Sequence, residues 1–156
     1  MNLIIAQVTS PTDDVRSLIA ELEATLAAEY LPEQQHGVAL DALFQPSIQF
    51  FIARSDDVAV GCGGVALCES FAEVKRMYVR PAARGNGVAD ALLARIEAAT
   101  RAAGLTRLYL ETGDRQLAAI RVYERAGFVR CAPFGPYLDM PPSSIATSVF
   151  FEKHLP

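Results

Sequence analysis

Apolar side chains recur at helical spacing in several stretches of the chain. After capping and acidic residues at 9–14, one apolar face extends to about Ala28 and comprises Val15, Leu18, Ile19, Leu22 and Leu26. A second helix is predicted over residues 88–103, ending at Gly104, and a third over 116–126, ending at Gly127. A short helix is expected around residues 38–44. The pattern therefore predicts about four helices.

Between these helices lie short apolar runs that are typical of strands. They cover residues 3–8, 47–54, 58–68, 72–80, 105–111, 128–131 and 147–153. The turn sequence at 55–57 predicts an antiparallel hairpin, whereas strand, helix and strand over 72–111 predict a parallel pair with a right-handed crossover. Gly61, Gly63 and Gly64 indicate a bulge or a close backbone approach. The expected fold is α+β, with a mixed, mostly antiparallel sheet of about seven strands.

Composition narrows the classes of function. A chain of 156 residues that is 51% hydrophobic fits one domain over 1–156. A formal net charge of −4 argues against a nucleic-acid surface. The first apolar run is too short for a signal peptide or a membrane span, so we expect a cytoplasmic protein without a membrane partner. The three cysteines fit no zinc spacing, and no metal is expected.

The junction between the strand at 72–80 and the helix at 88–103 is the strongest chemical signal. It reads Arg84-Gly85-Asn86-Gly87-Val88-Ala89. A helix start leaves backbone N–H groups unpaired and carries a partial positive charge, and glycines allow a ligand to approach the backbone closely. We therefore interpret this turn as a phosphate-binding site, with Arg84 as an additional charge.

Two common phosphate sites fit this turn poorly. A nucleoside-triphosphate loop needs a lysine and a hydroxyl residue after its glycines, and the chain has Gly87-Val88-Ala89-Asp90 instead. A dinucleotide fold is a closer rival, because Glu111 ends the next strand near the place of a ribose-binding acid. However, Asp90 stands where the third glycine of that motif belongs.

A second motif favours another interpretation. The segment Ala119-Ile120-Arg121-Val122-Tyr123-Glu124-Arg125-Ala126-Gly127-Phe128 places a tyrosine four residues before a glycine stop and an aromatic residue that enters a strand. Together with the segment from Arg80 to Ala89, this resembles the GNAT superfamily of acyl-CoA-dependent N-acyltransferases. Arg84, Gly87 and Ala89 match its signature of Gln or Arg, two residues, Gly, one residue, and Gly or Ala.

The resemblance implies how the cofactor is held. The strands at 72–80 and 105–111 would splay apart, and the pantetheine arm of acetyl-CoA would enter between them along Met77-Tyr78-Val79. The amides from Arg84 to Ala89, through Gly85, Asn86, Gly87 and Val88, would hold the pyrophosphate. Gln116 stands where relatives often have an asparagine that contacts the cofactor, and Tyr123 would protonate the departing thiolate.

Transfer to an amine also requires a base, because an amine with a pKa of about 10.4 is neutral in only about one part in 10³ at pH 7. Glu73 is one candidate and Glu111 is the second. Strand alternation puts Glu73, Lys75, Met77 and Val79 on one face, although a bulge would shift this. The structural alternative is that Glu73 forms an ion pair with Lys75 or Arg76.

The acceptor site is less clearly marked. Residues that fall where the family shapes its acceptor pocket are Tyr30, Glu33, Gln34, Glu111, Phe134 and Tyr137. The two histidines have no matching partner in the sequence and are expected at the surface or partly packed. We expect a small-molecule primary amine to attack acetyl-CoA directly in a ternary complex. A noncatalytic acyl-CoA-binding module is the alternative, and a homodimer is compatible with the resemblance.

Overall fold

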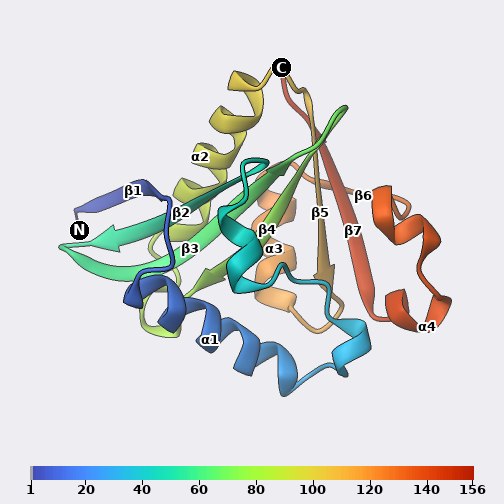
Figure 1. The fold of residues 1–156 in the computed structure, drawn as a ribbon, viewed down its shortest axis with the longest axis horizontal. Helices are drawn as coiled ribbons and strands as arrows, with labels where there is room; N and C mark the ends of the chain where they lie inside the picture. Colours follow the sequence, from blue (N-terminus) through green and yellow to red (C-terminus); the bar gives the residue numbers. More distant parts are fainter. Residues whose placement is uncertain (1) are drawn as a thin grey trace.

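The computed structural model describes residues 2–156 and contains one sheet of seven strands (Figure 1). The strands are β1 (Leu3–Val8), β2 (Ile48–Ser55), β3 (Val58–Leu67), β4 (Ala72–Val79), β5 (Arg107–Gly113), β6 (Val129–Arg130) and β7 (Ser148–His154). Their order in the sheet is β1-β2-β3-β4-β5-β7-β6, and only β4 and β5 are parallel neighbours. The predicted α+β class and mixed sheet are confirmed.

Helices cover both faces of this sheet. Helix α1 (Asp13–Ala27) lies on one face, and α2 (Val88–Ala102) and α3 (Leu117–Arg125) lie on the other (Figure 1). Each face has its own apolar core: Val15 and Leu18 of α1 pack on Phe50, whereas Leu92 of α2 packs with Phe51. Phe50 and Phe51 are neighbours in β2, so strand alternation divides the two cores.

Short helical segments fill the connections. They are the 3₁₀ helices η1 (Pro32–Gln34), η2 (Leu40–Phe44), η3 (Pro81–Ala83) and η4 (Gly135–Asp139), and the short α4 (Pro142–Ile145). The helix expected around residues 38–44 is thus a 3₁₀ turn that ends before Pro46. The strand expected over 128–131 is reduced to two residues, because the chain leaves β7 for the η4 segment.

Helices α1 and α2 begin at the residues that the sequence predicts. The Thr12 side chain accepts a hydrogen bond from Val15 N at 3.4 Å, and Asp13 and Asp14 follow in the first turn of α1. Helix α2 begins after Gly87, whose φ of +79° is a left-handed conformation that glycine adopts without a steric penalty. The turn before α2 is therefore specified by its own residues.

Strands β4 and β5 touch only at their beginnings. Their ladder consists of Ala72 beside Leu108 and Glu73 beside Tyr109, and beyond these pairs the strands diverge (Figure 1). A bulge reinforces the divergence: the β3–β4 register shifts between Cys62 and Gly64. The bulge predicted at the glycines of β3 is therefore present. The parallel strands β4 and β5 also separate, as the resemblance implies.

The bulge changes which side chains share a face. Arg76 has a left-handed φ of +54°, which is uncommon for a residue with a side chain. Val74 and Met77 are three residues apart, yet both pack in the core beneath α2 and α3. Strict alternation is therefore wrong beyond Arg76, because Met77 and Val79 no longer face the same way as Glu73 and Lys75.

Candidate active site

Two cavities meet where β4 and β5 separate. The larger has a volume of about 630 Å³ and lies beside the glycine turn, α2 and α3. The smaller has a volume of about 110 Å³ and lies beneath the segment that follows α1. Residues that line both are Leu22, Met77, Gln116, Ala119 and Tyr123. These side chains mark the passage from one cavity to the other.

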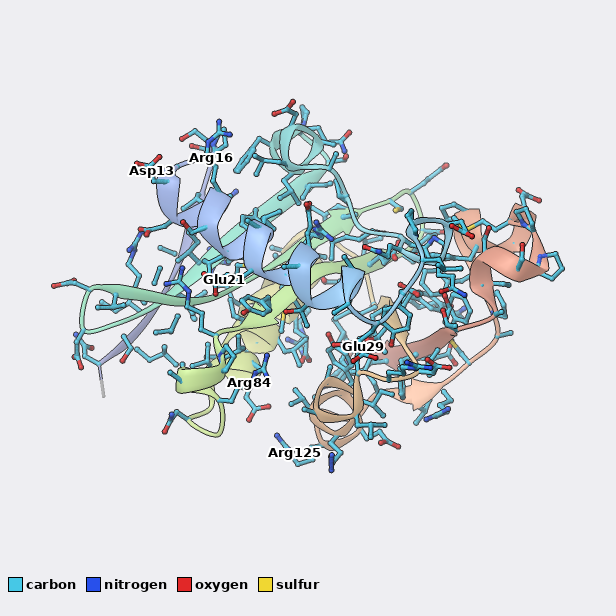
Figure 2. The ribbon with its side chains drawn as sticks, turned by 90° about the horizontal axis from the view of Figure 1, so that it is seen from below. Asp13, Arg16, Glu21, Glu29, Arg84 and Arg125 are labelled. Carbon is cyan, nitrogen blue, oxygen red and sulfur yellow. The ribbon has the colours of Figure 1, made fainter. Side chains whose placement is uncertain are left out.

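The larger cavity contains most of the residues expected to hold a cofactor. It is lined by Met77, Tyr78, Val79, Arg84, Gly85, Gly87, Val88, Ala89, Gln116 and Tyr123. Arg84 and Arg125 lie at its rim, on the turn before α2 and on α3 respectively (Figure 2). The start of α2 and these cations make this cavity suitable for an anionic ligand.

Two of the expected cofactor residues point elsewhere. The Asn86 side chain folds back and donates to the Ala83 carbonyl oxygen at 3.1 Å, so it supports the turn rather than lining the cavity. The Tyr78 hydroxyl donates to Glu21 Oε1 on α1 at 3.2 Å. Each residue can still present its backbone to a ligand, because both lie on the segment that borders the cavity.

Tyr123 lies at the passage between the cavities. Its ring packs edgewise on Phe128 at 5.9 Å between centroids and also lies near Phe151, which fixes its position on α3. Burial, followed by the charge of Glu111, raises the pKa of the Tyr123 hydroxyl above its ordinary value. The hydroxyl is therefore protonated at neutral pH and able to donate.

Glu73 belongs to a buried polar cluster with Lys75 and Tyr137. Its Oε2 accepts a hydrogen bond from the Tyr137 hydroxyl at 2.6 Å and lies 2.9 Å from Lys75 Nζ. Burial, together with the charge and hydrogen bond of Glu73, raises the pKa of Tyr137. The expected ion pair with Lys75 is therefore present, whereas Arg76 pairs with Glu23 of α1 at 2.7 Å.

Glu111 is the other carboxylate of the smaller cavity. The hydroxyl of Ser148 donates to its Oε2 at 2.6 Å, and no lysine or arginine within residues 2–156 forms an ion pair with it. Burial raises the pKa of Glu111, and the hydrogen bond from Ser148 and the charge on His36 oppose that effect only in part. A carboxylate with a raised pKa and no paired cation is a suitable proton acceptor.

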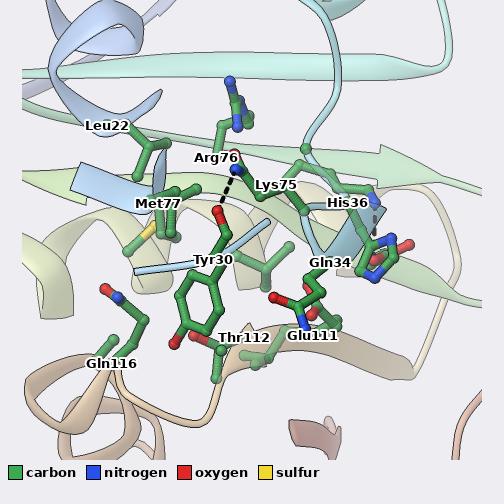
Figure 3. A pocket seen from close by; sticks show the side chains of 18 of the residues that line it. Leu22, Tyr30, Gln34, His36, Lys75, Arg76, Met77, Glu111, Thr112 and Gln116 are labelled. Atoms are coloured by element: carbon green, nitrogen blue, oxygen red, sulfur yellow. Dashed lines mark hydrogen bonds and ion pairs between the residues drawn. The ribbon is translucent and has the colours of Figure 1, made fainter. Parts of the chain in front are cut away.

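Tyr30 closes one side of the smaller cavity (Figure 3). Its hydroxyl accepts a hydrogen bond from the Arg115 backbone N–H at 2.8 Å, and Arg115 also forms an ion pair with Glu29 at 3.2 Å. These contacts join the end of α1 to the loop between β5 and α3. A side chain at Gly113 would collide with the Tyr30 ring, so glycine is what allows the ring to lie there.

The other expected acceptor residues divide between the cavity and its surroundings. Tyr137 lines the smaller cavity, whereas Phe134 lies behind it, packed on Tyr109 and Phe150. Glu33 is exposed and lines neither cavity, so its predicted position in the pocket is wrong. The η1 turn directs it to solvent.

Sequence reasoning missed several lining residues. They are His36, Lys75, Arg76 and Thr112, whereas Gln34 lines the cavity as expected. His36 was expected outside the site, but its ring lies 5.6 Å from that of Tyr137 and its Nε2 contacts the Ser144 carbonyl oxygen at 2.8 Å. No local pattern marks these positions, because they meet only through contacts between distant segments.

Comparison with known proteins agrees with this geometry. The sequence model of the acetyltransferase (GNAT) family matches residues 15–128. The chain belongs to the GNAT acetyltransferase family. A curated GNAT relative from Azospirillum brasilense, named IAA acetyltransferase, is 42% identical over 156 residues and is matched over 99% of each chain. The predicted resemblance and the class of enzyme, an acyl-CoA-dependent N-acyltransferase, are confirmed.

Two solved structures share the fold. One from Klebsiella pneumoniae, named as an acyl-CoA N-acyltransferase, has a TM-score of 0.75 and 37% identity, covering 98% of this chain and 97% of that one. The PaiA N-acetyltransferase of Thermoplasma acidophilum, solved with coenzyme A, has a TM-score of 0.71 and 18% identity, over 99% of each chain. The first supports both family and fold, and the second supports the fold.

Two features are absent from the described residues. Within residues 2–156, no helix combines the length and the apolar character needed to cross a membrane. In the same part of the chain, no group of three or more His, Cys, Asp or Glu residues is arranged to hold a metal ion.

Proposed function

We propose that this GNAT protein transfers the acetyl group of acetyl-CoA to the primary amine of a small molecule, by direct attack in a ternary complex. One observation carries the proposal: a large cavity beside the glycine turn and a small cavity beneath Tyr30 meet at Tyr123. Two substrates held on the two sides of that passage would bring their reacting atoms together. The coenzyme A in the Thermoplasma acidophilum relative supports the choice of donor.

The donor would occupy the larger cavity. Backbone amides of the turn from Arg84 to Ala89 would bind the pyrophosphate, with the N-terminal end of α2 behind them. Beyond Glu73, the side of β4 that faces β5 has no strand partner among residues 2–156. The pantetheine arm would pair with this free edge along Met77 and Val79, and the thioester would reach Tyr123.

The acceptor amine would be deprotonated in the smaller cavity. Neutralising an amine with a pKa of about 10.4 at pH 7 costs roughly 4 to 5 kcal/mol, at about 1.36 kcal/mol per pKa unit. Glu111 is the better-placed base, because Lys75 already neutralises Glu73 at 2.9 Å. Glu73 would hold Lys75 and Tyr137 in place.

The chemical step balances without another reactant. The neutral amine nitrogen forms a bond to the thioester carbonyl carbon, and the carbon–sulfur bond then breaks. Glu111 has taken one proton from the ammonium form of the amine, and Tyr123 gives its hydroxyl proton to the departing thiolate. The new amide nitrogen passes its second proton through water to the Tyr123 phenolate, and Glu111 releases its proton to solvent, so the products are an N-acetyl compound, CoA and one proton.

Thiol release from acetyl-CoA, measured with a panel of primary amines, tests this function. We expect amine-dependent release of CoA together with an acetylated product found by mass spectrometry. The Tyr123→Phe variant, which should still bind acetyl-CoA, serves as the matched control. Thermal protection by CoA without transfer to any amine would contradict the proposal and favour a binding module.

A further inference from the structure

The smaller cavity has a polar arrangement that goes beyond what amine acetylation requires. Its end near Met77 and Gln116 adjoins the donor cavity, whereas His36 and Lys75 lie toward the opposite end, with Tyr30 and Glu111 between (Figure 3). The reacting amine therefore belongs near Glu111 and Tyr123. The remainder of the acceptor must extend toward His36 and Lys75.

That far end still has hydrogen-bond donors to offer. Lys75 Nζ has three N–H groups, of which one points to Glu73 Oε2 at 2.9 Å and another to the Tyr137 hydroxyl at 3.2 Å. No third acceptor for it lies within residues 2–156. His36 donates its Nε2–H to the Ser144 carbonyl oxygen at 2.8 Å, so its Nδ1 can donate to a ligand in the imidazolium form of the ring.

The charged side chains at this end are already paired. Lys75 binds Glu73 at 2.9 Å and Arg76 binds Glu23 of α1 at 2.7 Å, although the Arg76 Nε is buried without a hydrogen-bond partner among residues 2–156. A second ammonium group could not accept a hydrogen bond from the remaining N–H group of Lys75. A carboxylate at the same place would accept it as a charge-assisted hydrogen bond.

The volume sets a limit on the acceptor's size. The cavity has about 110 Å³, somewhat less than an engineered cavity of about 150 Å³ that binds benzene. An occupant of about six non-hydrogen atoms fits this space. An amine and a carboxylate on one carbon, with a short side chain, are such a group.

We propose that the acceptor is a small amino carboxylate, whose amine faces Glu111 and Tyr123 and whose carboxylate is bound by Lys75 and His36. This inference rests on the proposed acetyl transfer and specifies its substrate class. The chemical step is the same as for any primary amine. The amino nitrogen gains the acetyl group, CoA leaves with the proton from Tyr123, and the carboxylate takes no part in bond formation.

Matched acceptors provide the test. Glycine, alanine and serine are each compared with their carboxamides, which have nearly the same shape and no negative charge. The amide lowers the pKa of the neighbouring amine, so intrinsic reactivity favours the carboxamide. We expect the opposite order in the enzyme, with kcat/KM at least tenfold higher for the amino acid.

Variants of Lys75 connect the preference to its proposed cause. Lys75→Met should reduce the ratio of amino acid to carboxamide kcat/KM at least tenfold, and Lys75→Arg should retain most of it. The ratio is informative even if a variant loses overall activity. Lys75→Met leaves the Glu73 carboxylate without its cation. The double variant Glu73→Gln/Lys75→Met removes that carboxylate as well, and it should show the same loss of preference for the amino acid over the carboxamide.

Lys153→Met is the matched control, because Lys153 is also a partly buried lysine in an ion pair, at 3.0 Å from Glu97, and lines neither cavity. It should leave the ratio unchanged. Calorimetry on the CoA-bound protein adds a readout without catalysis: N-acetylalanine should bind more tightly than its carboxamide, and Lys75→Met should abolish the difference.

The outcomes separate the two proposals. Carboxamides that are used as well as the amino acids, or a preference that survives Lys75→Met, would overturn the amino-carboxylate proposal and leave acetyl transfer intact. If acetyl-CoA binds but neither amino acids, carboxamides nor other amines are acetylated, the transfer reaction is contradicted and this inference fails with it.

Discussion

The phenol ring of Tyr30 lies directly against the backbone of Gly113, with no room for a side chain on residue 113. These residues come from the segment after α1 and from the end of β5, and their contact forms one wall of the smaller cavity. Gly113 does not have a left-handed φ, so its requirement is for space alone.

Gly113→Ala should therefore displace Tyr30 and impair acceptor binding more than donor binding. We expect a destabilisation of about 1–3 kcal/mol, the usual cost of overpacking, and a raised KM for the acceptor. Denaturant unfolding and steady-state kinetics measure the two effects. The double variant Tyr30→Leu/Gly113→Ala should recover part of the lost stability; if the two losses simply add, the proposed collision is wrong.

Tyr123→Phe removes the proposed proton donor while keeping the ring that packs on Phe128. Turnover should fall by about 10² or more, in the range of lost acid catalysis, with little change in the dissociation constant for acetyl-CoA. Single-turnover kinetics and calorimetry make the comparison. Tyr137→Phe, which removes the other buried hydroxyl near the site, should reduce turnover less.

Glu111→Gln should abolish the acidic limb of the pH–rate profile. A base acts when deprotonated, so the rate should rise with pH through the raised pKa of Glu111 in the wild type, and the glutamine variant should lack that rise. Glu73→Gln is the matched comparison and should retain it. A profile that loses its acidic limb only in Glu73→Gln would assign the base to Glu73 instead.

Rising pH should increase the reaction rate through Glu111 but should decrease the stability that Glu111 contributes. Because burial raises the pKa of Glu111 above its unfolded value, its contribution to stability is fully present below the unfolded pKa and is lost as pH rises through the folded pKa. Glu111→Gln has no such loss. The melting temperature of Glu111→Gln minus that of the wild type should therefore increase as pH rises from 4 to 8. If this difference stays constant, burial does not raise the pKa of Glu111.

The cysteines should differ strongly in reactivity. Burial raises the pKa of Cys62 to about 12 and that of the partly exposed Cys131 to about 11. Burial also raises the pKa of Cys68, but this residue is the exposed one of the three. At pH 8, a disulfide reagent should modify Cys68 first and Cys62 only after unfolding. Cys68→Ser should remove the fastest phase, and persistence of that phase would assign it to another thiol.

Local signals were sufficient for most of the fold and for the donor side of the site. Thr12 caps α1, Gly87 introduces α2, and the turn from Arg84 to Ala89 is continuous in sequence, so each could be identified from neighbouring residues. The acceptor side lacks such continuity. Tyr30 and Arg115 are 85 positions apart, and their contact depends on how α1 crosses the sheet.

The failures have equally specific causes. Glu33 and His36 are three residues apart in one connecting segment, yet only His36 lines the cavity, because the η1 turn comes between them. The face reversal after Arg76 also escapes a simple alternation rule, since a left-handed φ at an arginine has no reliable sequence marker. Both errors concern the direction of a side chain, not the presence of an element.

The bulge at Arg76 also determines which kinds of mutation β4 can accept. Because the reversal depends on one extra residue in the strand, deleting Arg76 would restore regular alternation with Met77, Tyr78 and Val79 on their present faces, and it would remove the bulge that accompanies the divergence of β4 from β5. Substitutions there alter single contacts. For this strand, a change in length therefore removes the bulge, whereas a change in residue type leaves the path of the strand in place.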